Sequence, residues 1–345
     1  MKIAITGGAG FLGINLTRHL LSAGHAVSVI DREMFDYEEL SRIEFLQGDI
    51  RKAADLDLAF HGCDYVVHAA AALPLHSSSE IYSVDVIGTR MVFEAAERAG
   101  VAGVVHISST AVYGVPKHHP IMEDDALVGV GPYGKAKIEA ESVAESFRTV
   151  FPVSILRPKS FIGPERLGVF AILFDWADSG ANFPIPGKGE NLYQYLDVSD
   201  LCSAIELCID NSHQTANDTF NIGAEEFSTF KRDFQSVLDL AGKGKRVISI
   251  PALPAIWILR LLDKVGLSPL YPWVYETAIK DSFVSIDKAK NTLGFAPKYS
   301  NQMALARNFD WYRTAKSSFT GKDGKTHRVP WKQGVLRLAK WVMKL

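Results

Sequence analysis

A tyrosine and a lysine stand four positions apart in the chain, as Tyr133 and Lys137. On a helix this spacing places the two side chains on one face, about one turn apart. A phenol with a pKa near 10 is only about 0.1% ionised at neutral pH, and lowering that pKa by about 3 units requires about 4 kcal/mol. A nearby ammonium supplies such stabilisation, so the pair is a candidate for proton exchange with a substrate hydroxyl or carbonyl.

Three hydroxyl side chains, Ser108, Ser109 and Thr110, follow a β-branched run that begins at Val104. If this run is a strand of a parallel sheet, its hydroxyl-rich end lies at the carboxyl edge, where ligands bind in such sheets. A serine hydroxyl at that edge can donate a hydrogen bond to the reacting oxygen.

A glycine-rich turn follows the apolar run Lys2–Thr6 and precedes a helical pattern. Glycine permits a tight turn and a close backbone approach, and the N-terminus of the next helix presents free N–H groups to a pyrophosphate. The predicted dinucleotide site consists of Gly7, Gly10, Phe11, Leu12 and Gly13. A nicotinamide ring bound there would exchange a hydride with the substrate and, when oxidised, would be a second cation beside the phenol.

An acidic residue, Asp31, ends the second apolar run, 18 residues beyond Gly13. This is close to the spacing of about 20 residues expected for an acid that binds ribose hydroxyls. A carboxylate repels a 2′-phosphate, so NAD is preferred over NADP, although the guanidinium of Arg32 would favour the phosphate. Asp49 and Ile50 follow the third run and either border the adenine or form a turn.

Short β-branched runs alternate with helical stretches through the first half of the chain. The predicted strands are Lys2–Thr6, Ala26–Asp31, Ile43–Gln47, Tyr65–Ala69, Val104–Ser108 and Val153–Arg157. The predicted helices between them are Phe11–Ala23, Ile87–Ala99 and Tyr133–Phe147. This alternation predicts an α/β fold with a Rossmann-type doubly wound parallel sheet. The looser, proline-rich second half predicts a smaller, mixed C-terminal substrate-binding region.

The composition is that of an ordinary globular protein, with 47% hydrophobic residues, 22% charged residues and a formal net charge of −2. It excludes wholesale disorder, and it shows no basic footprint for a nucleic-acid partner. Three scattered cysteines form neither a disulfide framework nor a metal-binding pattern. The N-terminal run resembles neither a signal nor a transit peptide. We therefore expect a cytoplasmic protein without a bound metal.

A series of ordered motifs resembles the extended short-chain dehydrogenase/reductases, specifically the NAD-dependent epimerase/dehydratase group. The resemblance covers roughly residues 1–312. Its motifs are Thr6–Gly13, His68-Ala69-Ala70, Gly88-Thr89, the run from Ser108 to Gly114, the Tyr133/Lys137 pair, Leu156-Arg157-Pro158 and Asp197-Val198-Ser199-Asp200.

This resemblance implies a catalytic set of serine, tyrosine and lysine. Ser109, four residues before Tyr113, matches the catalytic serine, whereas Tyr133 matches the acid/base and Lys137 its partner. Ser109 and Thr110 are placed beside the substrate. The cofactor-lining residues that the resemblance adds are His68, Ala69, Ala70, Tyr133 and Lys137. Family members are often dimers, so a homodimer is an expectation.

Two departures from the family pattern bear on the reaction. Similar dehydratases have an Asp-Glu pair after the serine, where this chain has Thr110-Ala111, and this difference disfavours water elimination. Asp85 stands where many members have an asparagine three residues before Gly88, so the hydrogen bonding behind the site is expected to differ. His106 matches no catalytic position and is expected to be a buried or loop histidine.

The substrate class remains open between two interpretations. The predicted substrate positions are Ser160 and Tyr193, where sugar-nucleotide enzymes of the family carry an Asn and an Arg, respectively. Without that arginine a diphosphate would lose a charge-assisted contact. The apolar segment 251–275 is similar to segments of 3β-hydroxysteroid dehydrogenase-like members, or is a packed core helix. We expect a sugar-nucleotide epimerase or reductase. A dehydrogenase or ketoreductase for a lipophilic substrate is the alternative. An alternative of another class is a protein without catalytic activity, a dinucleotide-binding sensor or scaffold.

Three regions are predicted along the chain: a dinucleotide-binding domain over 1–163 with late strands from the second half, an interleaved substrate-binding region over 164–314, and a basic tail over 315–345. The segment from Lys316 onward has eight Lys or Arg and one acid. A helical projection of the tail gathers Trp331, Val335, Leu338, Val342 and Leu345 opposite Arg337, Lys340 and Lys344. Such a helix either makes peripheral contact with the inner face of a membrane or packs on its own domain.

Overall fold

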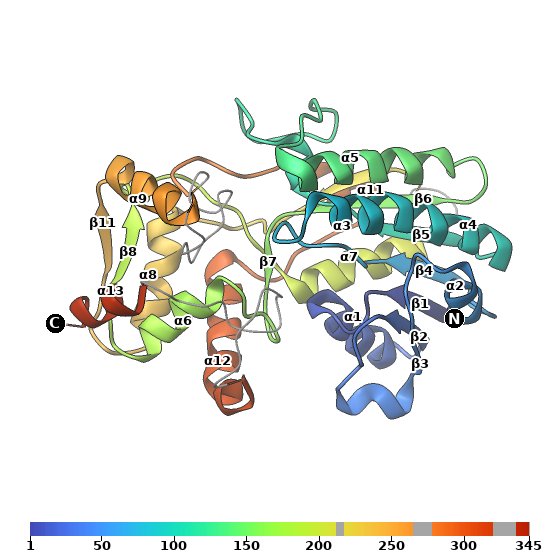
Figure 1. Cartoon of the computed structure of the whole chain (residues 1–345), viewed down its shortest axis with the longest axis horizontal. Helices are drawn as coiled ribbons and strands as arrows, with labels where there is room; N and C mark the ends of the chain where they lie inside the picture. The colour runs from blue at the N-terminus through green and yellow to red at the C-terminus, as the bar shows by residue number, and fades with distance from the viewer. Residues whose placement is uncertain (212–216, 265–277, 320–335, 345) are drawn as a thin grey trace. The chain divides into compact units, whose positions relative to one another are not determined.

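The computed structural model describes residues 1–211, 217–264, 278–319 and 336–344, which belong to two compact units (Figure 1). Unit 1 consists of Met1–Lys159, Val198–Gly223 and Val284–Pro297. Unit 2 consists of Ser160–Asp197, Ala224–Phe283 and Lys298–Leu345. The first boundary thus falls after residue 159 instead of 163. Of the predicted tail over 315–345, the described residues 315–319 and 336–344 belong to unit 2.

Unit 1 is built on a parallel sheet of seven strands in the order β3-β2-β1-β4-β5-β6-β10. Their bounds are β1 (Lys2–Thr6), β2 (Ala26–Asp31), β3 (Glu44–Gln47), β4 (Tyr65–His68), β5 (Gly103–Ile107), β6 (Val153–Pro158) and β10 (Thr219–Ile222). The strand order reverses direction at β1, which is the arrangement of a Rossmann-type sheet, so the predicted fold class is confirmed. The seventh strand comes from the second half of the chain.

Helices cover both faces of this sheet (Figure 1). On one face α1 (Phe11–Ser22) packs on α7 (Val198–Asp210), and on the other α4 (Thr89–Ala99) lies between α2 (Ala53–Ala59) and α5 (Gly131–Ser146). The remaining helical segments of unit 1 are η1 (Glu38–Arg42), α3 (Ser78–Tyr82), the π-helical turn η2 (Ser83–Gly88), η3 (Thr110–Tyr113) and α11 (Asp287–Leu293). Because both faces are covered, the strands are mostly apolar throughout, as parallel strands usually are.

Unit 2 combines two small parallel sheets with helices around an aromatic core. Its strands are β7 (Phe161–Ile162) paired with β9 (Leu196–Asp197), and β8 (Phe183–Pro186) paired with β11 (Val247–Ile250). The helices of unit 2 that the structure describes are α6 (Phe170–Asp178), α8 (Phe230–Leu240), α9 (Ala252–Lys264), α12 (Asn301–Phe319) and α13 (Leu336–Val342). The ring of Phe174 lies 5.7 Å from those of both Phe309 and Tyr312, which joins α6 to α12.

The C-terminal helix α13 docks on its own unit, with an orientation that differs from the projected one. The Lys340 ammonium lies 2.5 Å from the Asp175 carboxylate of α6, and Met343 packs on the cluster around Trp176. Val342 is 53% exposed. The projection put Val342 on the apolar face and Lys340 on the opposite, basic face. In the structure the basic side, through Lys340, faces α6, where Asp175 pairs with it, and Val342 faces outward.

Several residues of the projected tail face, Trp331, Val335 and Leu345, lie outside the described residues, as do the side chains of Arg337 and Leu338. Among the helices that the structure describes, none is both long and apolar enough to cross a membrane.

Candidate active site

The glycine turn between β1 and α1 forms an open cradle. Gly7 has a φ of +74°, and a Cβ there would lie 2.7 Å from the backbone of Ala70, at the end of β4. A Cβ on Gly13 would lie 2.3 Å from the Cα of Gly8. Beside Gly10, in contrast, a Cβ would meet only the Gly7 carbonyl within 4 Å. The turn is therefore packed tightly on its inner side and free on its outer side, at a helix N-terminus, which fits a pyrophosphate.

The carboxylate of Asp31 holds this turn against the end of β2. It accepts hydrogen bonds from the backbone N–H groups of Ala9 and Glu33, each at 2.9 Å. The predicted acid at the end of the second strand thus lies directly beside the glycine turn, where a ribose would follow the pyrophosphate.

An ion-pair network occupies the two basic groups near Asp31. The Arg32 guanidinium lies 2.9 Å from Glu80, and Arg51 bridges Glu80 at 3.2 Å and Asp49 at 2.6 Å. The Arg51 guanidinium holds the pKa of the Asp49 carboxyl below its usual range. Arg32 is therefore held by a carboxylate, which weakens its attraction for a 2′-phosphate.

The His68 ring is fully enclosed at the end of β4. Its Nδ1 accepts a hydrogen bond from the Thr6 hydroxyl at 2.8 Å, and its Nε2 donates to Thr89 Oγ1 at 2.9 Å. Thr89 in turn donates to the Asp85 carbonyl at 2.6 Å, which fixes this tautomer. Burial, helped by the charge of Lys137, lowers the pKa of His68 to about 3. The His68 ring is thus enclosed, and the half-buried Ala69 and Ala70 are the parts of this segment left to contact a cofactor.

The tyrosine and the lysine lie together on the first turns of α5. The Lys137 ammonium is 5.9 Å from the centre of the Tyr133 ring and donates a hydrogen bond to the Ile107 carbonyl, at the end of β5, at 3.2 Å. Lys137 is only 3% exposed, whereas Tyr133 is half-buried. A cation in a site of low dielectric stabilises a nearby phenolate more strongly than one in water.

The serine segment follows β5 and packs under the start of α5. Ser109 is half-buried, and its Oγ accepts a hydrogen bond from Ala111 N at 3.1 Å, which fixes the hydroxyl at the start of η3. The Thr110 hydroxyl reaches the Pro158 carbonyl at 3.4 Å. A Cβ on Gly134 would lie 3.0 Å from the Ala111 carbonyl, so this glycine permits the close approach of η3 and α5.

A buried polar network that the sequence analysis missed locks α5 in place. Glu141, one turn beyond Lys137, forms an ion pair with Arg157 of β6 at 2.7 Å and accepts a hydrogen bond from Ser108. Arg157 also donates to the Tyr113 hydroxyl at 2.8 Å. The spacing of Glu141 on the helix was visible in the sequence, but its partner on another element was not.

Two further buried groups lie behind the pair. Asp85 in η2 accepts a hydrogen bond from Ala72 N at 2.6 Å through Oδ1, while its Oδ2 is buried without a hydrogen-bond partner among the described residues. Burial raises the pKa of Asp85, and the charge of Lys137 opposes this shift. His106 of β5 is buried as expected, and neither ring nitrogen has a hydrogen-bond partner in the described part of the chain.

The predicted substrate positions Ser160 and Tyr193 belong to unit 2. Ser160 is exposed, and its carbonyl accepts a hydrogen bond from Leu196 N. The Tyr193 ring lies 5.0 Å from that of Tyr195 and 6.1 Å from that of Phe230, so it contributes to the aromatic packing of this unit. Any contact of these two residues with a substrate remains a prediction.

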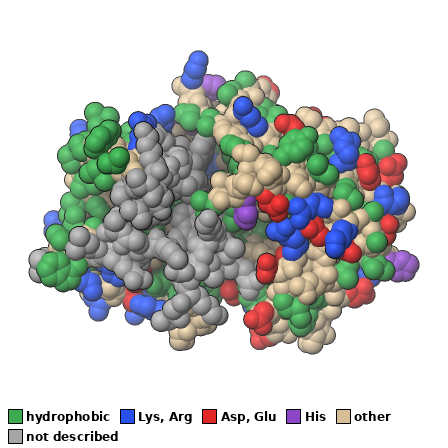
Figure 2. Space-filling view, in the orientation of Figure 1, with side chains coloured by type: hydrophobic (Ala, Val, Ile, Leu, Met, Phe, Trp, Pro, Cys, Tyr) green, Lys and Arg blue, Asp and Glu red, His purple; other side chains and the backbone are tan. Residues whose placement is uncertain are grey.

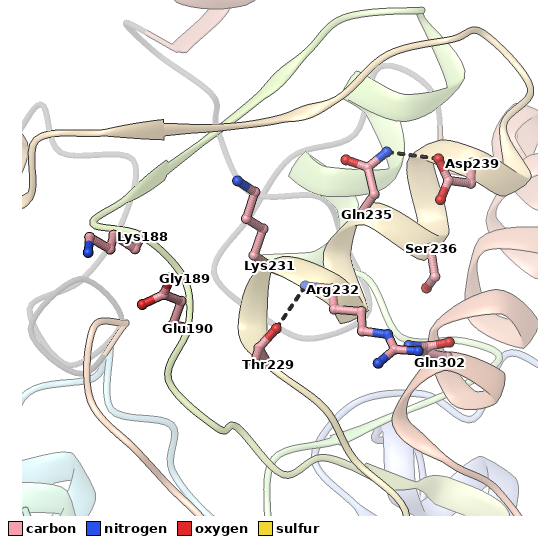
Figure 3. Close-up of a pocket in the computed structure, with 10 residues that line it drawn as sticks. All are labelled: Lys188, Gly189, Glu190, Thr229, Lys231, Arg232, Gln235, Ser236, Asp239 and Gln302. Atoms are coloured by element: carbon pink, nitrogen blue, oxygen red, sulfur yellow. Dashed lines mark hydrogen bonds between the residues drawn. The ribbon is translucent and has the colours of Figure 1, made fainter.

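A pocket of about 410 Å³ opens beside the start of α8 in unit 2. It contains none of the predicted site residues. Lys188, Lys231 and Arg232 line the pocket, but Figure 3 shows these three side chains pointing in different directions. Gln235 donates a hydrogen bond to Asp239. The charges do not converge on one point, so the pocket does not form an anion site.

A model of the NAD dependent epimerase/dehydratase family matches residues 3–223. An uncharacterized protein of Sinorhizobium fredii is 34% identical over 99% of this chain and 86% of its own length. A UDP-glucose 4-epimerase of Mycolicibacterium smegmatis is 27% identical over 91% of this chain and 99% of its own. A 3 beta-hydroxysteroid dehydrogenase/Delta 5-->4-isomerase of Mycobacterium tuberculosis is 28% identical over 90% of both chains.

A solved structure of an epimerase from Methanothermobacter thermautotrophicus has a similar fold. Its TM-score is 0.77 at 25% identity, and the match covers 92% of this chain and 93% of that one. The similarity therefore extends well beyond the glycine turn and includes both units.

Proposed function

Because this chain belongs to the NAD-dependent epimerase/dehydratase family, we propose that it is an NAD-dependent oxidoreductase acting on a secondary alcohol or ketone. The observation that carries this proposal is the placement of Lys137, a buried ammonium 5.9 Å from the Tyr133 ring. It lies at the carboxyl edge of the sheet, where the glycine turn also opens.

The residues that would hold NAD are those of the glycine turn and Asp31. Gly10 leaves room for the pyrophosphate, Gly7 and Gly13 allow the tight turn beneath it, and Asp31 is positioned for the ribose hydroxyls. The carboxylate of Asp31 and the pairing of Arg32 with Glu80 both favour NAD over NADP. When bound, the nicotinamide ring supplies hydride exchange.

The protein side of the reaction is proton transfer at the substrate oxygen. In the oxidation direction the Tyr133 phenolate takes the proton of the substrate hydroxyl, and in the reduction direction the phenol returns it. The Lys137 charge favours the phenolate. Ser109 Oγ accepts from Ala111 N and has its own proton for a hydrogen bond to the reacting oxygen. Thr110-Ala111 supplies no acid/base pair, so elimination of water is not expected.

We assign a sugar nucleotide as the substrate class, for epimerisation or reduction, because a UDP-glucose 4-epimerase matches 91% of this chain. A lipophilic 3β-hydroxy substrate is the second candidate. It is favoured by the similarity to a hydroxysteroid dehydrogenase and by the aromatic ring of Tyr193, which stands where sugar-nucleotide enzymes carry a diphosphate-binding arginine.

The experiment compares wild type and Tyr133→Phe with NAD and two substrates, UDP-glucose and a 3β-hydroxysteroid, following both NADH formation and epimerisation. Removing the acid/base group lowers kcat by roughly 10² to 10⁴ for whichever compound is turned over. The Kd for NAD, measured by fluorescence, stays within a few-fold. Full turnover by Tyr133→Phe would exclude the mechanism. Absence of NAD binding by the wild type would exclude the proposed function altogether.

A further inference from the structure

Helix α9 of unit 2 exposes an apolar stripe between Leu253 and Leu261, bordered by the exposed Arg260. Its outward side chains are Leu253 (81% exposed), Trp257 (65%), Ile258 (52%) and Leu261 (50%), together with the exposed Pro254. At 100° per residue these five positions lie within one 140° arc of the helix. Ile256, on the opposite side, is buried. A surface helix normally exposes polar side chains. Because the large apolar side chains of α9 are exposed, the described part of segment 251–275 is not a packed core helix, and residues 265–275 lie outside the described residues.

Two other elements of unit 2 extend this apolar surface. Ile248 of β11 is 36% exposed, and α13 exposes Trp341 (65%) and Val342 (53%) while its other side is docked. Backbone hydrogen bonds tie these elements together, because Asn182 N donates to the Met343 carbonyl and Phe183 N donates to the Arg246 carbonyl. Figure 2 shows hydrophobic side chains gathered over α9 and again at α13.

The chain around these elements carries a net positive charge. Residues 241–264, up to the end of α9, contain five Lys or Arg and one acid, Asp263. Lys243, Arg246 and Lys344 are exposed, and Lys245 donates to the Lys344 carbonyl, which brings the loop before β11 next to the end of α13. Apolar side chains with exposed tryptophans, flanked by cations, match the headgroup region of an anionic bilayer.

We propose that the surface formed by α9, Ile248 and the end of α13 docks on an anionic lipid bilayer. This docking surface differs from the tail helix projected from the sequence, because α9 carries most of the exposed apolar residues and Lys340 is held by Asp175. A second copy of the chain is a poorer occupant, since self-association would bring cations against cations. The proposal is independent of the catalytic function, because none of the site residues belongs to this surface.

The test is sedimentation of the full chain with vesicles of phosphatidylcholine alone and of phosphatidylcholine mixed with phosphatidylglycerol. We expect binding to the mixed vesicles, and a loss of roughly tenfold or more in the double variant Trp257→Glu/Leu261→Glu. Lys243→Gln/Arg246→Gln weakens binding to the mixed vesicles and makes it less sensitive to salt. Leu58→Glu, which replaces a residue of α2 that is 69% exposed, is the matched control and binds like the wild type.

All variants must retain the wild-type Kd for NAD, which shows that they fold. The proposal is overturned if the wild type does not bind the mixed vesicles, or if Trp257→Glu/Leu261→Glu binds them as tightly as the wild type does. Light scattering tests whether a second copy of the chain binds to this surface instead. A dimer that the double variant converts to a monomer would identify the surface as an interface between copies and would also overturn the proposal.

Discussion

At the scale of single residues, the site differs from its family pattern most at Asp85. The side chain is 1% exposed and accepts only the hydrogen bond from Ala72 N among the described residues. An asparagine would keep the acceptor and remove the charge. Burial raises the pKa of Asp85 above its unfolded value, although Lys137 and His76 act in the opposite direction. The anionic form is therefore disfavoured by folding.

We predict that Asp85→Asn stabilises the protein at pH 8, by about 1 kcal/mol, because the amide carries no charge for burial to penalise. A carboxyl whose pKa is raised in the folded state takes up a proton on folding, so the wild type loses stability as the pH rises. The advantage of the variant accordingly shrinks from pH 8 toward pH 4.5. Urea unfolding of both proteins at pH 8 and at pH 4.5 measures this difference in the free energy of unfolding. A variant less stable than the wild type at pH 8 would show that the Asp85 anion is a net stabilising partner of Lys137.

At the scale of elements, the sequence predicted the strands best where their sequence was uniformly apolar and ended in a turn residue. The bounds of β1 (Lys2–Thr6) and β2 (Ala26–Asp31) agree with the prediction. Helix α4 was expected to begin at Ile87, but the chain forms the π-helical turn η2 up to Gly88. A Cβ on Gly88 would lie 2.7 Å from Ile50, and such a contact between distant segments has no local signal in the sequence.

The contact between η3 and α5 leads to a prediction about the position of the catalytic pair. In Gly134→Ala the new Cβ lies 3.0 Å from the Ala111 carbonyl and from Gly129 Cα, so the start of α5 must shift. A shift of a few tenths of an ångström at Tyr133 misaligns proton transfer, and we expect kcat to fall about tenfold or more. The KM for the substrate and the Kd for NAD change little.

Steady-state kinetics with the substrate identified for the wild type measure this effect. Lys135→Ala, an exposed substitution on the same turn, is the control and retains wild-type kcat. Unchanged kcat in Gly134→Ala would mean that α5 absorbs the extra methyl group without moving Tyr133.

At the scale of the whole molecule, the sequence specified the dinucleotide-binding half well and the rest poorly. Periodicity and the glycine turn are local signals, and they located the residues of unit 1 that lie near its sheet edge. Unit 2 is held by contacts between distant segments, such as the ion pair between Arg307 and Asp197 at 2.6 Å. The network of Glu141 with Arg157 was missed for the same reason, since each residue alone resembles a surface charge.

The buried histidines of adjacent strands make the stability of the molecule depend on pH. His68 and His106 lie in register on β4 and β5, with ring centres 5.3 Å apart. Burial lowers the pKa of His68 to about 3 and the pKa of His106 well below its usual value. The nearby charge of Lys137 contributes to both shifts. The unfolded chain binds protons that the folded chain does not, so stability is retained above pH 6.5 and lost as the pH falls below it.

We predict that His106→Leu reduces this acid sensitivity. Between pH 7.5 and pH 5.5 each such histidine costs the wild type about 1.4 kcal/mol, because an unfolded histidine has a pKa of about 6.5. The variant avoids one of these two contributions and also removes a ring whose nitrogens have no hydrogen-bond partner among the described residues. Thermal midpoints at both pH values measure the difference. His61→Leu replaces an exposed histidine and is the control, which keeps the wild-type difference between the two thermal midpoints. If His106→Leu loses as much stability between pH 7.5 and pH 5.5 as the wild type does, His106 is not buried in its neutral form.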